Sequence, residues 1–256
     1  MSAAAALQIY RRTWLKVLRR PVTLTFSLAQ PLLWMLFFGF LFERYRLIDG
    51  RAEGLRYLDF LAPGVCAMTV LFGASQSGVS WIRDLQIGFL PRLLATPASR
   101  HALLGGKIAA DVSRLMLQAL GVLALALMLG VRLEPRPSAV APGLLALLLF
   151  ATAFSCLSCA LALRARSQEV MATFIHLVNM PMLFTSTALV PTRQMPPWLA
   201  GVAEWNPLSL AVDAWRGALL LGESVSWLGQ IAPLAALAAA LYALALREMC
   251  RLTELY

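Results

Sequence analysis

Six uncharged, apolar segments constrain this 256-residue chain more than any other feature. Each has the length, about 20 residues, at which an α-helix crosses the hydrocarbon core of a bilayer and satisfies its own backbone hydrogen bonds there. The segments are Val22 to Phe42, Phe60 to Ile82, Leu115 to Val131, Gly143 to Leu163, Val170 to Val190 and Trp227 to Leu246. We therefore predict an all-α, polytopic membrane protein with six transmembrane helices, organised as one domain over residues 1–256.

The composition and the charge distribution agree with this prediction. Hydrophobic residues make up 60% of the chain and charged residues 14%. The net charge of +9 would also suit nucleic-acid binding, but the basic residues gather at segment ends that share one side when both termini are cytoplasmic. The groups are Arg11 to Arg20, Arg83 to Lys107, Arg164 with Arg166, and Arg247 with Arg251. We predict a chain of the bacterial cytoplasmic (inner) membrane with both termini inside and no nucleic-acid partner.

The first predicted outer loop weakens the charge signal without reversing it. It carries Arg44, Arg46, Arg51 and Arg56, and it offsets them with Glu43, Asp49, Glu53 and Asp59. The positive-inside rule counts only Lys and Arg, so the acidic residues do not cancel the arginines in that count. The four basic groups still outweigh this loop.

Residues 1–20 predict an amphipathic helix at the membrane surface. Leu7, Tyr10, Trp14 and Leu18 recur at helical spacing, and the basic residues occupy other faces of the helix. Such a helix places its aromatic side chains at headgroup depth and its cations near anionic lipid. It serves either as a membrane anchor alone or as an anchor that also touches a soluble partner, and the sequence leaves both interpretations open.

The sequence contains no catalytic, cofactor-binding or metal-binding constellation. Gly105-Gly106-Lys107 resembles the end of a phosphate-binding loop, but His101 replaces its first glycine and Ile108 replaces the hydroxyl residue that holds magnesium. We interpret the two glycines as a flexible turn into the third span. Energy for uphill transport by this chain would have to come from another protein.

The segment between the second and third spans carries the most informative motif. It reads Arg83-Asp84-Leu85-Gln86-Ile87-Gly88-Phe89-Leu90-Pro91-Arg92-Leu93-Leu94-Ala95-Thr96-Pro97. Leu85, Phe89 and Leu93 recur at helical spacing and form an apolar stripe that could fill a groove in a soluble partner. Gly88 would let another chain approach closely, and Pro91 favours two short helical pieces. The alternative is a helix that packs only against its own membrane domain.

Residues 191–224 differ from the spans in composition. Four prolines interrupt the segment, and Trp198 and Trp205 suit a membrane interface. Asp213 and Arg216 are three residues apart and can pair on one helix face. Because carrying each charge across the bilayer costs roughly 2.5–3.5 kcal/mol, we predict a re-entrant or surface hairpin on the outer face. It acts either as a lid or directly in substrate release.

A few polar residues inside the spans suggest a transport path. Gln76 and Ser77 lie in the second span, and His176 and Asn179 lie in the fifth. Such groups either face a water-accessible path or form hydrogen bonds between helices. Asp111 and Arg114, three residues apart in the third helix, are predicted to pair near its cytoplasmic end.

Two motifs closely resemble those of type-2 ATP-binding-cassette (ABC) exporter permeases, and with the shared topology the resemblance covers essentially the whole chain. The first is Arg83-Asp84-(x)3-Gly88-Phe89-Leu90-x-Arg92-Leu93-Leu94-x-Thr96-Pro97, continued to Arg100. The second comprises Met195-Pro196-Pro197-Trp198-Leu199, Asn206-Pro207-Leu208, Asp213, Arg216 and Leu221-Gly222. Gln86 and Pro91 depart from the family pattern, which is usually acidic at the former position and often at the latter. Gln86 and Pro91 have no carboxylate, so the resemblance implies no salt bridge from these two positions to a partner.

The resemblance implies a role for each motif and a set of partners. Residues 83–100 would form a cytoplasmic coupling helix that docks on a separate ABC ATPase subunit, through Arg83, Asp84, Gly88, Phe89, Arg92, Leu93, Thr96 and Pro97. The extracellular hairpin before the last span would include Trp198, Asn206, Pro207, Asp213 and Arg216. A second permease copy would complete the assembly, as a homodimer, in membrane lipid. ATP and magnesium would bind the ATPase, and this chain would bind no cofactor.

Three classes of function follow from these observations. The first is the permease subunit of an ABC exporter for an apolar or amphiphilic substrate, such as a drug, lipid, glycolipid or polysaccharide. The second is a transporter or channel that works without nucleotide, and the third is a membrane-bound enzyme. The second lacks internal repeats and intramembrane ionisable pairs, and the third lacks a catalytic constellation.

Overall fold

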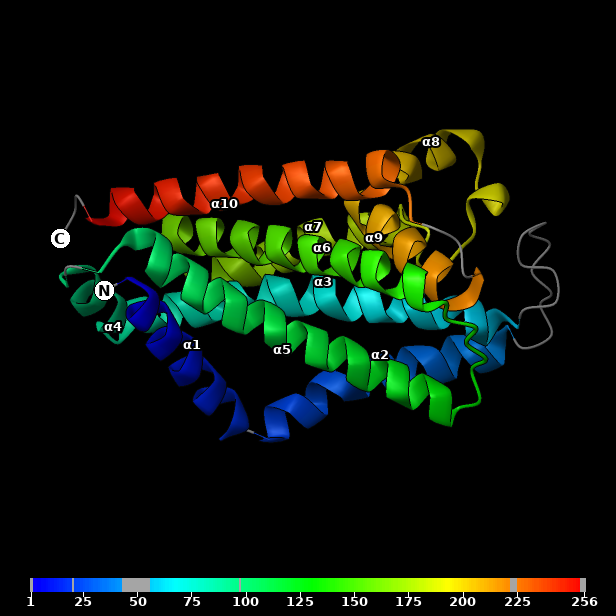
Figure 1. Ribbon diagram of the computed structural model, residues 1–256, viewed down its shortest axis with the longest axis horizontal. Coiled ribbons are helices and arrows are strands. Elements are labelled where there is room, and N and C mark those ends of the chain that lie inside the picture. The colour runs from blue at the N-terminus through cyan, green and yellow to red at the C-terminus, as the bar shows by residue number, and fades with distance from the viewer. Residues whose placement is uncertain (1, 20, 43–55, 97, 222–224, 254–256) are drawn as a thin grey trace.

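The protein is an elongated bundle in which every regular element of the described residues is a helix. The computed structural model describes residues 2–19, 21–42, 56–96, 98–221 and 225–253. The helices are α1 (Ser2–Leu18), α2 (Pro21–Leu41), α3 (Tyr57–Gln86), α4 (Phe89–Leu94), α5 (Arg100–Met128), α6 (Pro137–Ala165), α7 (Gln168–Phe184), η1 (Thr192–Gln194), α8 (Pro197–Trp205), α9 (Pro207–Arg216), η2 (Gly217–Leu221), η3 (Trp227–Ile231) and α10 (Ala232–Thr253). Figure 1 shows α3, α5, α6 and α10 running along the bundle, with α4, the start of α1 and the end of α10 at the same end.

Four of the described helical segments are long and apolar enough to cross a membrane. They are Tyr57–Gln86, Arg100–Met128, Pro137–Ala165 and Trp227–Leu252, and Ala29–Leu41 is a shorter apolar helix. These segments match the second, third, fourth and sixth predicted spans. The all-helical membrane protein expected from the sequence is therefore confirmed at this level.

The fifth predicted span ends earlier than the sequence suggested. Its helix, α7, has 17 residues and ends at Phe184 rather than at Val190. Pro181 lies inside α7, and the Thr185 hydroxyl donates to the Pro181 carbonyl oxygen at 2.9 Å as the helix ends. The next residues leave the helix, and their polar groups bond to Asn206 and to Ser209 and Asp213 of α9.

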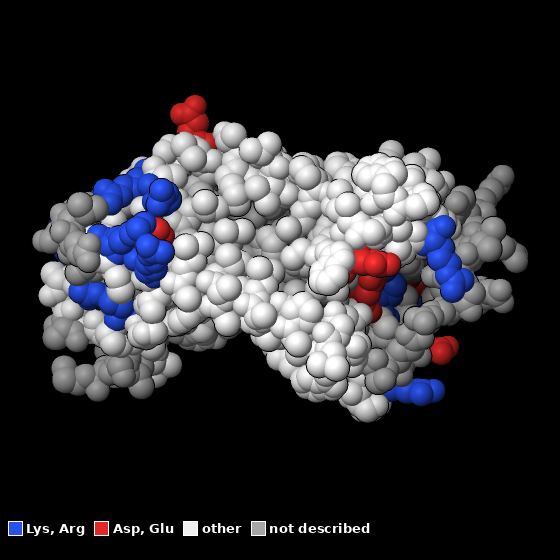
Figure 2. Space-filling view, turned by 90° about the horizontal axis from the view of Figure 1, so that it is seen from above, with Lys and Arg blue, Asp and Glu red and all other residues white. Residues whose placement is uncertain are grey.

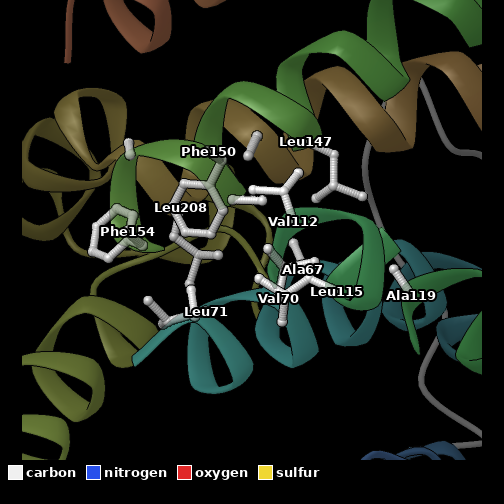
Figure 3. Close-up of a cluster of buried hydrophobic side chains, with 14 of the residues drawn as sticks. Ala67, Val70, Leu71, Val112, Leu115, Ala119, Leu147, Phe150, Phe154 and Leu208 are labelled. Atoms are coloured by element: carbon white, nitrogen blue, oxygen red, sulfur yellow. The ribbon is translucent and has the colours of Figure 1, made fainter. Parts of the chain in front are cut away.

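Helix α3 lies at the centre of the bundle. Figure 3 shows buried side chains of α3, α5, α6 and α9 meeting there, among them Leu71, Leu115, Phe150 and Leu208. Lipid tails are as apolar as these side chains, so close van der Waals packing rather than water exclusion holds such helices together. Small residues permit that packing: a Cβ on Gly78 would lie 2.6 Å from the Met171 methyl carbon of α7.

Helix α1 packs against α5 in addition to any contact with lipid. A Cβ on Gly106 of α5 would lie 2.9 Å from Cα of Ala6, so the two backbones meet directly. The Tyr10 hydroxyl donates to Oγ of Ser113 at 3.2 Å. Leu7 is 66% exposed and faces away from this contact. The prediction of a flexible turn at Gly105-Gly106 is wrong, because both glycines lie inside α5 and Gly106 contacts the backbone of α1.

Candidate functional site

The corner between α3 and α4 forms the tip of the predicted coupling segment. Helix α3 continues past the apolar core to Gln86, and the Ile87 amide closes it by donating to the Arg83 carbonyl oxygen at 3.0 Å. Gly88 then turns the chain with φ of 73°, a conformation in which a Cβ is unfavourable. Pro91 falls in the first turn of α4, where a missing amide hydrogen costs nothing. The segment is divided into two helical parts, as expected, but the first is the end of the 30-residue helix α3, only α4 is short, and the break is at Gly88 and not at Pro91.

The apolar stripe of this segment faces its own membrane domain. Leu85 and Leu93 pack against the hydrophobic core, and the Phe89 ring lies 3.3 Å below the Arg12 guanidinium of α1. Packing on the domain was the alternative that the sequence left open for this stripe. The residues that remain exposed are Arg83, Gln86, Ile87, Arg92, Ala95 and Thr96. The face available to a partner is therefore polar and cationic, with Ile87 as its one large apolar side chain, 60% exposed.

Asp84 lies inside the protein, although the resemblance placed it among the residues that dock on a partner. It is 4% exposed. Its Oδ2 accepts from Nζ of Lys107 at 2.6 Å, and its Oδ1 accepts from Nζ of Lys16 at 2.8 Å. Arg12 adds a longer ion pair of 3.6 Å. Asp84 therefore joins α1, α3 and α5 and does not lie on the exposed face.

The remaining residues of the predicted coupling set lie as follows. Gly88 has open space around it, since a Cβ there would meet nothing within 4 Å. The Thr96 hydroxyl donates to the Leu93 carbonyl oxygen at 2.6 Å and closes the end of α4. Arg92 is exposed. Pro97 lies outside the described residues.

The residues proposed for a transport path divide into two groups. Asn179 of α7 is fully buried, and its Oδ1 accepts from the Ser75 hydroxyl at 3.0 Å. Ser77 is also buried, and its hydroxyl has no hydrogen-bond partner among the described residues. Gln76 and His176 are exposed instead. The structure thus joins Asn179 to Ser75, not to Gln76.

A second polar contact holds α6 close to α3. The Ser158 hydroxyl donates to the Ser75 carbonyl oxygen at 2.7 Å and accepts from the Gly78 amide at 2.9 Å. Because Ser75 also bonds to Asn179, hydrogen bonds connect three neighbouring helices at one level. Sequence reasoning missed Ser158, which stands next to Cys159 in the fourth predicted span.

At the opposite end of the bundle, Arg216 holds several segments together. The predicted pair with Asp213 is confirmed, with Nη1 of Arg216 3.2 Å from Oδ1 of Asp213. The guanidinium also donates to the carbonyl oxygens of Phe60 at 3.2 Å and Thr187 at 2.9 Å, and it lies 3.7 Å from the centre of the Phe60 ring. The Thr187 hydroxyl completes the cluster by donating to Asp213 at 2.7 Å.

Asn206 fastens the segment between α8 and α9 to the end of α7. Its amide nitrogen donates to the Met182 carbonyl oxygen at 2.8 Å and to the Thr185 hydroxyl at 2.9 Å. Its Oδ1 accepts from the Leu208 amide at 2.9 Å and caps α9, where Pro207 occupies the first turn. Sequence reasoning missed the turn after α7 as the anchor of this hairpin. The polar run Thr185-Ser186-Thr187 was the available signal.

A mostly apolar groove runs between α7 and α8. It has a volume of about 740 Å³. Its lining comprises Leu177, Val178, Pro181, Met182, Thr185, Trp198, Gly201, Val202, Trp205 and Asn206. Trp198 and Trp205 are both strongly exposed, as expected for interface residues. The only hydrogen-bonding side chains of this lining other than the two indoles are Thr185 and Asn206.

The predicted pair of Asp111 and Arg114 does not form among the described residues. Arg114 instead donates to Oε1 of Gln118 at 3.2 Å and to the Gly73 carbonyl oxygen at 3.3 Å. Asp111 is buried, and its Oδ2 has no hydrogen-bond partner among the described residues. Contacts with the neighbouring helix α3 therefore override the local spacing at Arg114.

On the face seen in Figure 2, charged side chains avoid the middle of the molecule. Figure 2 shows Lys and Arg gathered at one end, which is the end that carries α4 in Figure 1, and a broad uncharged belt beside it. An uncharged belt between charged ends is the surface that a bilayer requires.

Residues 5–220 match the family model of the ABC-2 type transporter. The chain belongs to the ABC-2 type transporter family. Its relatives include ycf38 of Pyropia yezoensis, named as a transport permease, which is 36% identical over 84% of this chain and 73% of that protein. The daunorubicin resistance ABC transporter permease protein DrrB1 of Streptomyces coeruleorubidus is 30% identical over 81% of this chain and 71% of that protein. The resemblance seen in the two motifs is therefore confirmed.

Proposed function

We propose that this ABC-2 family chain is the membrane-spanning subunit of an ABC exporter. It moves an apolar or amphiphilic substrate outward, using ATP hydrolysed by a separate ATPase subunit. One observation carries the proposal: α3 runs unbroken from the centre of the bundle to the exposed corner at Ile87 and Gly88, at the basic end. A push on that corner would act directly on the central helix.

The proposed topology has six spans and cytoplasmic termini in a bacterial inner membrane. Helices α2 and α7 supply the two spans beyond the four long apolar segments. The position of the start of α1, the end of α10 and α4 at one end supports this arrangement. At the other end, α8 and α9 form the proposed re-entrant hairpin, and the burial of Leu208, Val212 and Trp215 among the spans supports it.

The proposed assembly contains two permease copies and two ATPase chains. Helix α7 supports a homodimer because it leaves Val170, Leu177 and Phe184 exposed. ATP and magnesium would bind the ATPase, since no phosphate-binding motif is present in this chain. The name of the DrrB1 relative supports the inclusion of amphiphilic drugs among the substrates to be tested.

Vesicle transport tests this function directly. The permease, purified with the ATPase that it retains, is reconstituted into vesicles with fluorescent drugs, lipids and glycolipids as separate probes. We expect at least one probe to stimulate ATP hydrolysis and to move toward the outer face, and an ATPase with its catalytic carboxylate replaced should abolish both effects. Transport that continues at the same rate without ATP would contradict the proposal and identify a nucleotide-independent transporter.

A further inference from the structure

One buried carboxylate holds three basic side chains from two other helices. Lys16 and Arg12 come from α1, and Lys107 comes from α5; all three pair with Asp84 at the end of α3. Lys107 is 5% exposed, and its ammonium group also lies 4.1 Å from the centre of the Trp81 ring. A buried ammonium group of this kind is stable only beside its partners, so the cluster fixes the three helices relative to one another.

Further contacts fix α1 to α5 and to α4. The backbones of α1 and α5 meet at Gly106, and the bond between Tyr10 and Ser113 adds a second point of attachment. Arg12 lies over the Phe89 ring and so connects α1 to the first residue of α4. The cytoplasmic half of α5, the α3–α4 corner and α1 are therefore joined at several independent points.

Helix α7 is attached to the same corner much more weakly. At this end, the amide of Gln168 donates to Oε1 of Gln86 at 3.1 Å, and the bond is exposed. An exposed bond between neutral groups contributes less than charge-assisted bonds in the interior. Movement of the corner would therefore break the contact with α7 before it separated α1 from α5.

We propose that Lys107 is a positioning residue which, through Asp84, joins α1, the α3–α4 corner and the cytoplasmic half of α5 into one mechanical unit that shifts against α7 during transport. This inference rests on the proposed function, because an ATPase must supply the push. Only two residues separate the end of α1 at Leu18 from the start of α2 at Pro21, so the unit also transmits the movement to the first span. The coupling segment thus acts through α1 as well as through α3.

Reversible cross-links test which contacts must open. In a chain with Cys250 replaced by serine, one variant carries cysteines at Tyr10 and Ser113 and another at Gln86 and Gln168. The native side chains at these positions form hydrogen bonds, at 3.2 Å between Tyr10 and Ser113 and at 3.1 Å between Gln168 and Gln86. A short cleavable reagent with two thiol-reactive ends bridges each pair in the complex with its ATPase. We expect the bridge between α1 and α5 to leave ATP-driven export unchanged and the bridge to α7 to stop it until the reagent is cleaved.

A substitution of Lys107 tests its own part. Lys107→Met keeps the length of the side chain and removes its charge, and we expect about tenfold less substrate exported per ATP hydrolysed, a usual size for coupling between two sites. Lys107→Arg should retain most of the yield, and the bridge between positions 10 and 113 should restore part of it to Lys107→Met. Arg114→Met is the matched control on α5, because Arg114 bonds to Gln118 and Gly73 and not to the corner.

Three outcomes separate this inference from the proposed function. A wild-type yield per ATP in folded Lys107→Met, or export stopped equally by both bridges, would overturn the inference while the proposed function stood. Export by the unmodified chain that is independent of ATP would overturn both. A yield lost in Lys107→Met and partly restored by the bridge supports the inference, because a general loss of folding would not be repaired by one cross-link.

Discussion

At the scale of single residues, buried charges decide which segments stay together. Arg216 is 8% exposed and connects α9, to which it belongs, with the start of α3 and with the turn after α7. The Thr187 carbonyl oxygen lies beyond the end of α7, where the helix supplies no donor, and the Phe60 carbonyl oxygen lies in the first turn of α3. The charge is tolerated because its partners surround it.

Replacement of Arg216 should therefore destabilise the protein strongly. In Arg216→Met, Asp213 loses its ion pair and the carbonyl oxygens of Phe60 and Thr187 lose the bonds from the guanidinium, so we expect a loss of about 3–5 kcal/mol in the free energy of unfolding. Thermal unfolding of the detergent-solubilised protein would measure the change. Arg136→Met, at an exposed position, is the control and should alter stability by less than about 0.5 kcal/mol. Equal unfolding temperatures for both variants would refute the role assigned to Arg216.

Asn179 and Gln76 should respond differently to the same substitution. Asn179→Leu removes the buried bond to Ser75 and should lower stability by about 1 kcal/mol, the usual size of a hydrogen bond between membrane helices. Gln76→Leu changes an exposed side chain and should alter the export rate or substrate preference at unchanged stability. Export per folded complex, measured beside thermal unfolding, separates the two effects. Loss of stability in Gln76→Leu with normal export per folded complex would remove Gln76 from the transport path.

Two pairs of charged residues show what local spacing can predict. Asp213 with Arg216 and Asp111 with Arg114 are both three apart on a helix, and only the first pair forms in the described structure. Arg216 and Asp213 both bond to Thr187, so the tertiary contact brings the two charged side chains together. Arg114 is directed instead to the Gly73 carbonyl oxygen of α3 and to Gln118 of its own helix. Spacing makes a pair possible, but the neighbouring helix decides whether it forms.

At the scale of elements, the α3–α4 corner determines what a partner can touch. Leu85, Phe89 and Leu93 recur at helical spacing in the sequence, but Leu85 lies in α3 and the other two lie in α4, beyond the turn at Gly88. A sequence also does not tell whether apolar side chains face their own domain or another protein. The structure turns Leu85 and Leu93 inward and exposes Ile87. It also places the break at Gly88, because glycine adopts the left-handed turn and a proline in a first helical turn breaks nothing.

Substitution of Gly88 should separate backbone strain from steric blocking. Gly88→Ala adds only the strain of a Cβ at positive φ, about 1 kcal/mol, and we expect it to be inserted and to export. Gly88→Trp adds a large side chain at a position where this chain itself leaves open space. We expect it to be inserted and dimeric but to lose its ATPase or its export. If alanine and tryptophan behave alike in ATPase binding and export, the corner is not the docking surface.

At the scale of the whole molecule, the apolar segments were sufficient to predict the fold class, and the resemblance of two motifs was sufficient to recognise the family. Four segments reappear as long apolar helices, and Lys and Arg gather at one end. The sequence did not show that Val170 to Val190 is divided at Phe184, because every residue up to Val190 is compatible with lipid or with a neighbouring helix. Bonds from Asn206, more than 20 residues later, fix that end.

The proposed topology predicts which positions are reached from outside the cell. A cysteine at the exposed Gln194 should react with an impermeant thiol reagent added to whole cells, and a cysteine at the exposed Arg92 should react only after the membrane is opened. Replacement of the exposed Cys250 by serine removes the background. Labelling at position 92 from outside would contradict the arrangement of both termini and of α4.

The measurement that tests the central claim most directly is capture of the ATPase at the corner in living cells. A photo-crosslinking amino acid at the exposed Ile87 should capture a protein whose sequence contains the ATP-binding motifs of an ABC ATPase, identified by mass spectrometry. The same amino acid at buried Leu90, three residues along the chain, should not. If position 87 captures only lipid or another permease copy while position 92 also yields no ATPase, the claim that this segment receives the push of ATP hydrolysis is wrong.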